Sequence, residues 1–305
     1  MAFARTITPW KLRSRSLELG RRTLVSGVIN ITPDSFSDGG NFLDPQAAIA
    51  HAIQLIEEGA DILDLGAEST RPGAQAGDEA AKVSAEEEQE RLLPVIKGIL
   101  KLKPDTVLSA DTYKASTAQA ALAAGAEIIN DVSGFTWDGA MPALCAQSGC
   151  GVVLMHTRGR PDEWRAQAKL PADALLKSVQ KGLAESLATA SRFGIAHESI
   201  VLDPGYGFGK KSDENYALLA RQSQLLALGR PLLAGLSRKS FLGHTLSPLH
   251  RGAQAPIDAR ETASIAALVA AVLNGASVVR VHQVRPAIEA ARIADAILNA
   301  VQTLY

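Results

Sequence analysis

Polar and charged side chains stand at the ends of successive apolar runs along this 305-residue chain. They offer carboxylates, amides, imidazoles and cations, a set that can bind and polarise a small charged molecule. The residues are Asn30, Asp64, Asp111, Asn130, Asp131, His156, Asp203, Ser237, Lys239, Arg280 and His282. A few polar run ends would be ordinary, but so many in the same position predict one shared polar site, as in an enzyme.

Cations gather at the last two of these positions. Arg238 and Lys239 lie in the segment SRKS, and Arg280 and His282 lie in the segment RVH. Arg matches phosphate oxygens bidentately and can stack on an aromatic ring. Most charge runs form a solvated helix face, but these residues follow apolar runs, so they predict an anion site.

Two glycine-containing segments follow apolar runs, residues 30–40 (NITPDSFSDGG) and 203–210 (DPGYGFGK). The first is either an ordinary Asn/Asp-rich turn or a ligand loop, and Phe36 favours a ligand loop because its ring needs something to cover. The second lacks the phosphate-loop pattern, since Lys211 stands where that pattern needs Ser or Thr. We interpret it as a flexible loop that lets its backbone and Phe208 approach a flat ligand.

The apolar runs are rich in Val, Ile and Leu and alternate with helical patterns, which predicts βα units on a parallel sheet. The runs span residues 24–31, 61–67, 106–112, 127–132, 151–157, 199–204, 231–237 and 277–282. The helical patterns span residues 45–58, 84–101, 114–124, 140–147, 173–192, 258–273 and 285–304. Eight units close a (β/α)8 TIM barrel, whose active site lies at the C-terminal strand ends. We expect one such domain over residues 1–305, with residues 10–20 forming an N-terminal hairpin that plugs the barrel bottom.

Three connections are long for a barrel, residues 32–44, 68–83 and 241–257. All three follow strands, so they are expected on the catalytic face. Loops of this length are usually functional or disordered. The first two are dense in polar and turn residues, which predicts mobile lids.

Composition excludes several classes of protein. A net charge of −1 gives no global attraction to nucleic acid or to a membrane surface. No stretch approaches the ~20 apolar residues of a membrane span. Cys145 and Cys150 are too few for a disulfide framework and predict two buried thiols. The basic N-terminal residues lack the apolar core of a signal peptide, so we expect a cytoplasmic protein.

Residues 263–273 (ASIAALVAAVL) are apolar nearly all round, whereas an outer barrel helix normally keeps a polar face. One face of this helix packs on the barrel, so the other needs cover. The alanines would let a partner helix approach closely, and the last helix carries an alanine-rich stripe beside it. This pattern predicts a homodimer through the last helices.

Taken in chain order, these segments resemble the pterin-binding enzyme family and, within it, the dihydropteroate synthases of bacterial folate synthesis. The matching motifs span about residues 25–282 and are GVINITPDSFSDGG, DLGAESTRPG, SADTYK, EIINDVSG, VVLMH, VLDPGYGFGK, GLSRKSFLG and VRVH. The first two loops and SRK are specific to the synthases. The chain departs from the family at Thr157, Tyr206 and Gln283, and none of these positions carries an assigned role.

The resemblance implies a transferase that joins 6-hydroxymethyl-7,8-dihydropterin diphosphate to p-aminobenzoate, releases diphosphate and uses Mg²⁺. Its small-molecule substrates would be the only partners besides a second copy of the chain. The resemblance implies catalytic roles for Asp111, Lys239 and Asn30, with Asn30 also holding the metal. The pterin would contact Asp111, Asn130, Asp203, Lys239 and Arg280. Diphosphate would contact Asn30, Arg71, Arg280 and His282, and p-aminobenzoate would contact Phe36, Thr70, Pro72, Phe208 and Ser237.

Two other functions stay open at this point. A corrinoid-linked methyltransferase that binds methyltetrahydrofolate shares the Asp and Asn strand ends, but it needs neither diphosphate cations nor a p-aminobenzoate pocket. A non-catalytic pterin-binding paralogue would share the fold. The presence of Asn30, Arg71, Asp111, Lys239 and His282 argues against the paralogue.

Overall fold

The computed structural model describes residues 5–32, 44–68 and 83–302, and within them eight parallel strands close into a barrel. Around the barrel the strands follow the order β10-β3-β4-β5-β6-β7-β8-β9. Their bounds are β3 (Leu24–Asn30), β4 (Ile62–Gly66), β5 (Leu108–Asp111), β6 (Ile128–Asp131), β7 (Gly151–Met155), β8 (Ile200–Asp203), β9 (Leu232–Ala234) and β10 (Ala276–Val281). Each strand falls within one of the apolar runs or overlaps it, so the predicted (β/α)8 barrel is confirmed.

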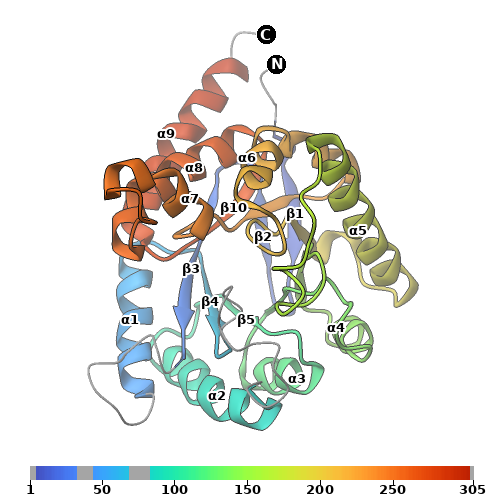
Figure 1. Cartoon of the computed structure of the whole chain (residues 1–305). Helices are drawn as coiled ribbons and strands as arrows, with labels where there is room; N and C mark the ends of the chain where they lie inside the picture. Colours follow the sequence, from blue (N-terminus) through green and yellow to red (C-terminus); the bar gives the residue numbers. More distant parts are fainter. Residues whose placement is uncertain (1–4, 33–43, 69–82, 303–305) are drawn as a thin grey trace.

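Helices surround the strands on the outside of the barrel (Figure 1). They are α1 (Pro45–Glu57), α2 (Ala85–Leu102), α3 (Ala115–Ala124), α4 (Met141–Ser148), α5 (Ala172–Arg192), α6 (Ser212–Ala220), α7 (Ser240–Thr245), α8 (Glu261–Leu273) and α9 (Val284–Gln302). The sequence did not predict α6 or α7. Helix α6 buries Glu214 and Asn215 together with Leu218 and Leu219, so its inner face lacks an apolar stripe.

Sequence signals at helix starts act as expected. The Ser84 side chain accepts a hydrogen bond from the Glu87 amide at 3.1 Å, and three glutamates fill the first turn of α2. The Asp44 side chain accepts a bond from the Gln46 amide at 2.9 Å and starts α1. Both contacts satisfy amides that a helix start leaves without a partner.

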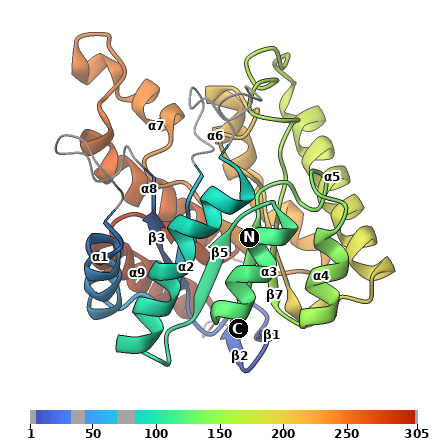
Figure 2. The same cartoon turned by 90° about the horizontal axis from the view of Figure 1, so that it is seen from below.

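The N-terminal hairpin consists of β1 (Thr8–Lys11) and β2 (Ser16–Leu19), paired antiparallel. Figure 2 shows it at the opposite end of the barrel from α6 and α7. Trp10 is 1% exposed, and its indole Nε1 donates to the Ser199 carbonyl at 2.9 Å. Its ring belongs to a core cluster with the first residues of the barrel strands, which includes Leu24, Ile62, Ile128, Val201 and Val278. The hairpin therefore plugs the barrel bottom, as predicted.

Strand register brings polar strand ends together at the other end. Asp111 on β5 is the Cα partner of Gly66 on β4 and of Asn130 on β6. On the far side of the barrel, Met155 on β7 is the partner of Asp203 on β8. Because all strands are parallel, their carboxyl ends share one rim, and this register sets the spacing of the site.

The three long connections have different outcomes. Residues 33–43 and 69–82, which hold most of the two predicted lids, lie outside the described residues. The third connection is not an irregular loop, because α7 and two 3-10 segments, Ser247–His250 and Ile257–Arg260, occupy it. Short helical turns of this kind carry too few residues to show a periodic pattern.

Two expectations from composition can also be compared with the structure. Cys145 and Cys150 are free, buried thiols, as predicted. Among the described residues, no helix is long and apolar enough to cross a membrane.

Replacing Trp10 with Ala should remove most of the bottom plug and leave a cavity beneath the strands. Deletions of a large buried ring typically lower the free energy of unfolding by about 3–5 kcal/mol. Urea unfolding followed by circular dichroism measures the loss. The exposed neighbour Lys11 provides the control, since Lys11→Ala should change stability by less than about 0.5 kcal/mol. A change as small as the control's would show that the plug does not stabilise the barrel.

Candidate active site

A cavity of about 320 Å³ opens at the C-terminal rim of the barrel. Every predicted site residue within the described ranges lines it: Asn30, Asp111, Asn130, Asp203, Phe208, Ser237, Lys239, Arg280 and His282. The remaining predicted residues, Phe36, Thr70, Arg71 and Pro72, lie outside the described residues. The cavity has the mixed lining of aromatic, cationic and carboxylate groups that a flat, charged ligand needs.

The guanidinium of Arg280 joins two carboxylates across the barrel. Its Nε donates to Asp64 Oδ2 at 2.5 Å, and its Nη2 donates to Asp111 Oδ2 at 2.6 Å. Asp64 is 2% exposed at its side chain and Asp111 is 17% exposed. Two carboxylates can lie this deep because one cation is hydrogen-bonded to both.

Asp64 also accepts hydrogen bonds from two other strands. Ser109 Oγ on β5 donates at 2.6 Å, and Asn130 Nδ2 on β6 donates at 3.1 Å. Asp64 thus fixes both Arg280 and Asn130 from beneath the cavity. One N–H of the Asn130 amide is used here, so its second N–H and its carbonyl oxygen are left to face a ligand.

Burial raises the pKa of Asp111 to about 7. The neighbouring Asp64 charge adds to this rise, while the Arg280 guanidinium opposes it. Asp111 is therefore mainly ionised above pH 7 and mainly protonated below it. Because its pKa is higher in the folded chain than in the unfolded chain, it contributes stability as the pH falls through about 7.

Asp203 lies at the end of β8 and is 6% exposed. Its Oδ1 accepts a hydrogen bond from the Gly205 amide at 2.7 Å. Burial raises its pKa, and this amide bond is the largest influence in the opposite direction. The turn after β8 therefore holds the carboxylate in a fixed orientation at the cavity wall.

Phe208 forms an aromatic side of the cavity. Its ring contacts Trp164 edge to face at a centroid distance of 5.1 Å. The Lys239 Nζ lies 4.1 Å from the Phe208 centroid, a cation–π distance. Gly207 allows this approach, because a Cβ there would lie 3.3 Å from Lys239 Cδ.

Ser237 and His282 meet at the ends of β9 and β10. The His282 Nδ1 lies 3.0 Å from Ser237 Oγ. The same hydroxyl accepts a bond from the His282 amide at 3.3 Å. This contact fixes the imidazole beside Arg280, so two cation-type side chains share the mouth with a hydroxyl.

Two of the polar strand ends face away from the cavity. Asp131 is fully buried, and its carboxylate accepts hydrogen bonds from the Ser133 and Phe135 amides at 2.8 and 2.9 Å. The His156 ring packs against helix α5, where a Cβ on Gly182 would lie 2.6 Å from its Cδ2. Successive strand side chains point to opposite faces, so the position after an inward residue points outward.

Several residues that line the cavity were not predicted. They are Glu68, Trp164, Tyr206, Gln254, Ile257 and Arg260. They lie in connections, where no periodic pattern marks an inward side. Asp64 was expected at a strand end with the other polar residues, but it lies in the middle of the buried strand ILDLG, where its carboxylate has internal partners beneath the cavity.

Among the described residues, no group of three or more His, Cys, Asp or Glu side chains can hold a metal ion by itself. Asn30 is half-buried at the end of β3 and offers an oxygen to the cavity. Mg²⁺ is often held by one or two protein oxygens together with substrate phosphates and waters. The donors at this rim fit that kind of site and not an all-protein cage.

Comparisons with known proteins agree with this geometry. A family model described as pterin binding enzyme matches residues 26–282. The chain is 42% identical over 276 residues to dihydropteroate synthase from Mycobacterium leprae, covering 90% of this chain and 94% of that one. It is 40% identical over 295 residues to the mitochondrial folate synthesis bifunctional protein of Pisum sativum, covering 93% of this chain and 55% of that longer protein. The solved structure of Xanthomonas albilineans dihydropteroate synthase with 4-aminobenzoic acid matches with a TM-score of 0.84 and 38% identity, covering 96% of this chain and 98% of that one.

Replacing Arg280 with Met should raise the pKa of Asp111 above its value of about 7, because the nearest opposing cation is lost. Carbon-13 NMR titration of the Asp111 carboxyl measures this shift. Arg238→Met is the matched control, since Arg238 lines the cavity but bonds to Glu261 on α8. An Asp111 pKa that stays the same in Arg280→Met and in the control would contradict the ion pair.

Proposed function

This chain belongs to the pterin binding enzyme family, and we propose from that membership which of its residues carry out each part of the dihydropteroate synthase reaction. The chain acts as a transferase that condenses 6-hydroxymethyl-7,8-dihydropterin diphosphate with p-aminobenzoate. The amine nitrogen forms a bond to the exocyclic methylene carbon and loses a proton. The carbon–oxygen bond to diphosphate breaks, and 7,8-dihydropteroate is the product.

The inner cavity wall is suited to the pterin edge. Asp203 would accept from the ring N–H and the amino group, because its carboxylate is held by Gly205 and is buried. Asn130 would offer its carbonyl oxygen and its second amide N–H beside it, because Asp64 takes one N–H. Lys239 would donate to a ring acceptor. A site built from such hydrogen bonds rejects rings that lack the matching groups.

Asp111 would stabilise the charge that develops during bond breaking. Departure of diphosphate leaves positive charge on the methylene carbon, and that charge spreads into the pterin ring. A carboxylate fixed by Arg280 needs no reorganisation to face this charge. In the ionised form that prevails above pH 7, Asp111 would therefore favour the transition state.

The diphosphate would lie at the cationic mouth. Arg280 and His282 are placed there by β10, and Arg71 would join them from the second connection. Asn30 would hold Mg²⁺, which would supply positive charge to neutralise the leaving diphosphate. Arg280 would also stack on the pterin face.

p-Aminobenzoate would lie on the outer side of the cavity. Phe208 supplies a ring for stacking, with Phe36 and Pro72 closing over the substrate from the first two connections. Ser237 and Thr70 would meet its carboxylate. Closing these groups over the site would keep water from capturing the cation.

One observation carries this proposal: the carboxylates of Asp111 and Asp203 line the same cavity as the cations Arg280 and Lys239. A methyltetrahydrofolate-binding methyltransferase would have no use for Arg280 and His282 around a leaving diphosphate. A non-catalytic paralogue is separated by a steady-state assay of diphosphate release with both substrates. Turnover that requires both substrates supports the synthase, whereas binding of the pterin without turnover would favour the paralogue.

Replacing Asp203 with Asn should weaken pterin diphosphate binding by about 10- to 100-fold, because an amide cannot accept from both donors of the pterin edge. Isothermal titration calorimetry measures the change. Asp213→Asn is the control, since Asp213 is exposed on α6 and pairs with Lys169. Equal affinity in Asp203→Asn and wild type would remove Asp203 from the pterin site.

p-Aminobenzoate should bind the free enzyme weakly and bind tightly once diphosphate and Mg²⁺ are present. The reason is that Arg71, Thr70 and Phe36 belong to connections that diphosphate would organise. Calorimetric titration with and without a pterin, diphosphate and Mg²⁺ measures the difference. Phe36→Ala should raise the KM for p-aminobenzoate far more than the KM for the pterin. Equal p-aminobenzoate affinity in both conditions would refute this ordered binding.

We also propose a cytoplasmic homodimer that pairs through α8 and α9. Ala266 on α8 is exposed, and on α9 the exposed fractions of Ile293 and Ile297 are 64% and 47%. The two isoleucines lie one turn apart on the same helix face. Light scattering at micromolar concentration should give twice the mass of one chain. Glu at both isoleucine positions should give the single-chain mass, while Phe193→Glu on the exposed end of α5 should not.

A further inference from the structure

A single buried lysine side chain ties together the turn that follows β8. Lys210 is 7% exposed, and its Nζ donates to three backbone carbonyls. The acceptors are Gly205 at 2.7 Å, His156 at 3.2 Å and Phe208 at 3.3 Å. Gly205 and Phe208 belong to the turn after β8, and His156 follows β7. The Lys210 side chain therefore bonds within its own turn and also links that turn to the end of β7. The turn is therefore held in place, unlike the flexible loop that the glycines suggested.

Each of these carbonyls belongs to a residue that supports a ligand-facing group. The Gly205 amide holds the Asp203 carboxylate at 2.7 Å, and Gly205 has a φ of +69° that leaves no room for a Cβ beside the His156 carbonyl. The His156 amide in turn donates to the Asp203 carbonyl at 2.9 Å. Phe208 carries the ring that meets Lys239 and Trp164.

Lys210 thus supports both Asp203, which is proposed to bind the pterin, and Phe208, which is proposed to stack on p-aminobenzoate. Neither contact would survive unchanged if the turn shifted. A change at Lys210 should therefore be felt by both substrates at once.

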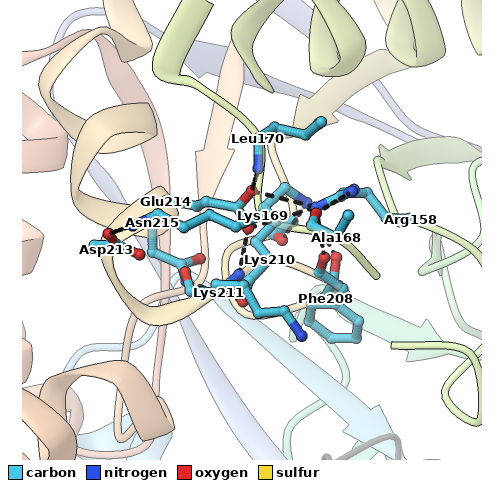
Figure 3. Close-up of polar contacts among 12 residues, drawn as sticks. Arg158, Ala168, Lys169, Leu170, Phe208, Lys210, Lys211, Asp213, Glu214 and Asn215 are labelled. Carbon is cyan, nitrogen blue, oxygen red and sulfur yellow. Dashed lines mark hydrogen bonds and ion pairs between the residues drawn. The ribbon is translucent and has the colours of Figure 1, made fainter. Parts of the chain in front are cut away.

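A second layer of charged contacts holds the outside of the same turn (Figure 3). Arg158 donates to the Gly209 carbonyl at 3.2 Å and pairs with the buried Glu214 of α6 at 3.3 Å. Glu214 also accepts from the Leu170 amide at 2.7 Å, and the Asn215 side chain accepts from the Gly207 amide at 2.7 Å. These contacts hold Gly207 and Gly209 from the outside of the turn, while Lys210 holds the carbonyls on its inner side.

Keeping a cation at this depth is costly. Burial lowers the pKa of Lys210 to about 7, with Lys239 and Arg158 acting in the same direction and Asp203 and Glu214 opposing them. Three carbonyl oxygens favour the charged form in return. An apolar side chain of similar length would avoid this cost, which indicates that the hydrogen bonds serve the geometry of the turn.

We propose that Lys210 is a positioning residue that sets Asp203 and Phe208 together, so that it acts on the binding of both substrates without touching either. This inference rests on the proposed function. It differs from a purely stabilising role, in which a folded variant would bind both substrates as wild type does.

Lys210→Met is the deciding variant, because Met keeps the length of the side chain and removes all three donors. Steady-state assays of diphosphate release should show the KM for both substrates raised by about tenfold, the size of losing one or two charge-assisted hydrogen bonds. The kcat should change by less than the KM values. Calorimetry with 6-hydroxymethylpterin, which carries no leaving group, should show a matching loss of affinity.

Lys211→Met is the matched control, since Lys211 is the next residue and its exposed Nζ contacts only the Arg165 carbonyl among the hydrogen bonds described. It should leave both KM values unchanged. If Lys210→Met keeps the circular dichroism spectrum of wild type and also keeps its KM values and pterin affinity, the positioning role is wrong. A rise in KM for one substrate alone would also overturn the joint effect.

Lys210→Arg covers the case in which the Met variant does not fold. Arg keeps the charge, but its planar fork cannot meet three converging carbonyls in the same way. The KM values of Lys210→Arg should exceed those of wild type, and they should rise less than those of Lys210→Met if that variant folds. KM values equal to those of wild type would contradict the proposal. Wild-type enzyme that releases no diphosphate would disprove the proposed function instead, and the pterin titrations would still test Lys210.

Discussion

The placement of one guanidinium between two buried carboxylates constrains this barrel more than any other contact at its rim. Asp64 and Asp111 come from the consecutive strands β4 and β5, and Arg280 comes from β10 at the far end of the sequence. Removing one partner of a buried ion pair leaves an uncompensated charge and typically costs about 3–5 kcal/mol. The strands therefore have to reach the rim in one register, because a shift of a single residue would turn a carboxylate outward. Asp64 extends the constraint to Ser109 and Asn130, so the polar floor of the cavity behaves as one unit.

This unit is supported from two directions. Below it, the apolar starts of the strands pack on Trp10 of the hairpin, which fixes how the strands are arranged before they reach the rim. Beside it, charged side chains of the connections after β7 and β8 hold backbone carbonyls and amides. The turn that carries Phe208 is ordered by side-chain contacts and not by a strand ladder. The cavity wall formed by Asp111, Asn130 and Asp203 therefore depends on strand geometry, while the position of Phe208 depends on a few hydrogen bonds.

Much of this arrangement could be predicted from the residues. Apolar runs located all eight strands, and polar residues at their ends located the floor and mouth of the cavity. The limits are physical. Asp131 and His156 looked equivalent to Asn130 and Asp203, but side-chain alternation along a strand turns them away from the cavity. Helix α6 escaped prediction because its inner face uses buried Glu214 and Asn215 in place of an apolar stripe. The role of Lys210 depends on carbonyls brought together only by folding, so no spacing in the sequence reveals it.

The hairpin at the barrel bottom affects how ligands and water enter and leave the cavity. With Trp10 filling that end, the cavity formed by the described residues is closed below and opens at the carboxyl ends of the strands. A molecule that lies against Asp203 and Asn130 therefore leaves toward the rim, past the groups that line the mouth. Water that a ligand displaces from the cavity leaves toward the same rim through which the ligand enters. A molecule bound at the mouth would therefore slow the departure of one bound against Asp203 and Asn130.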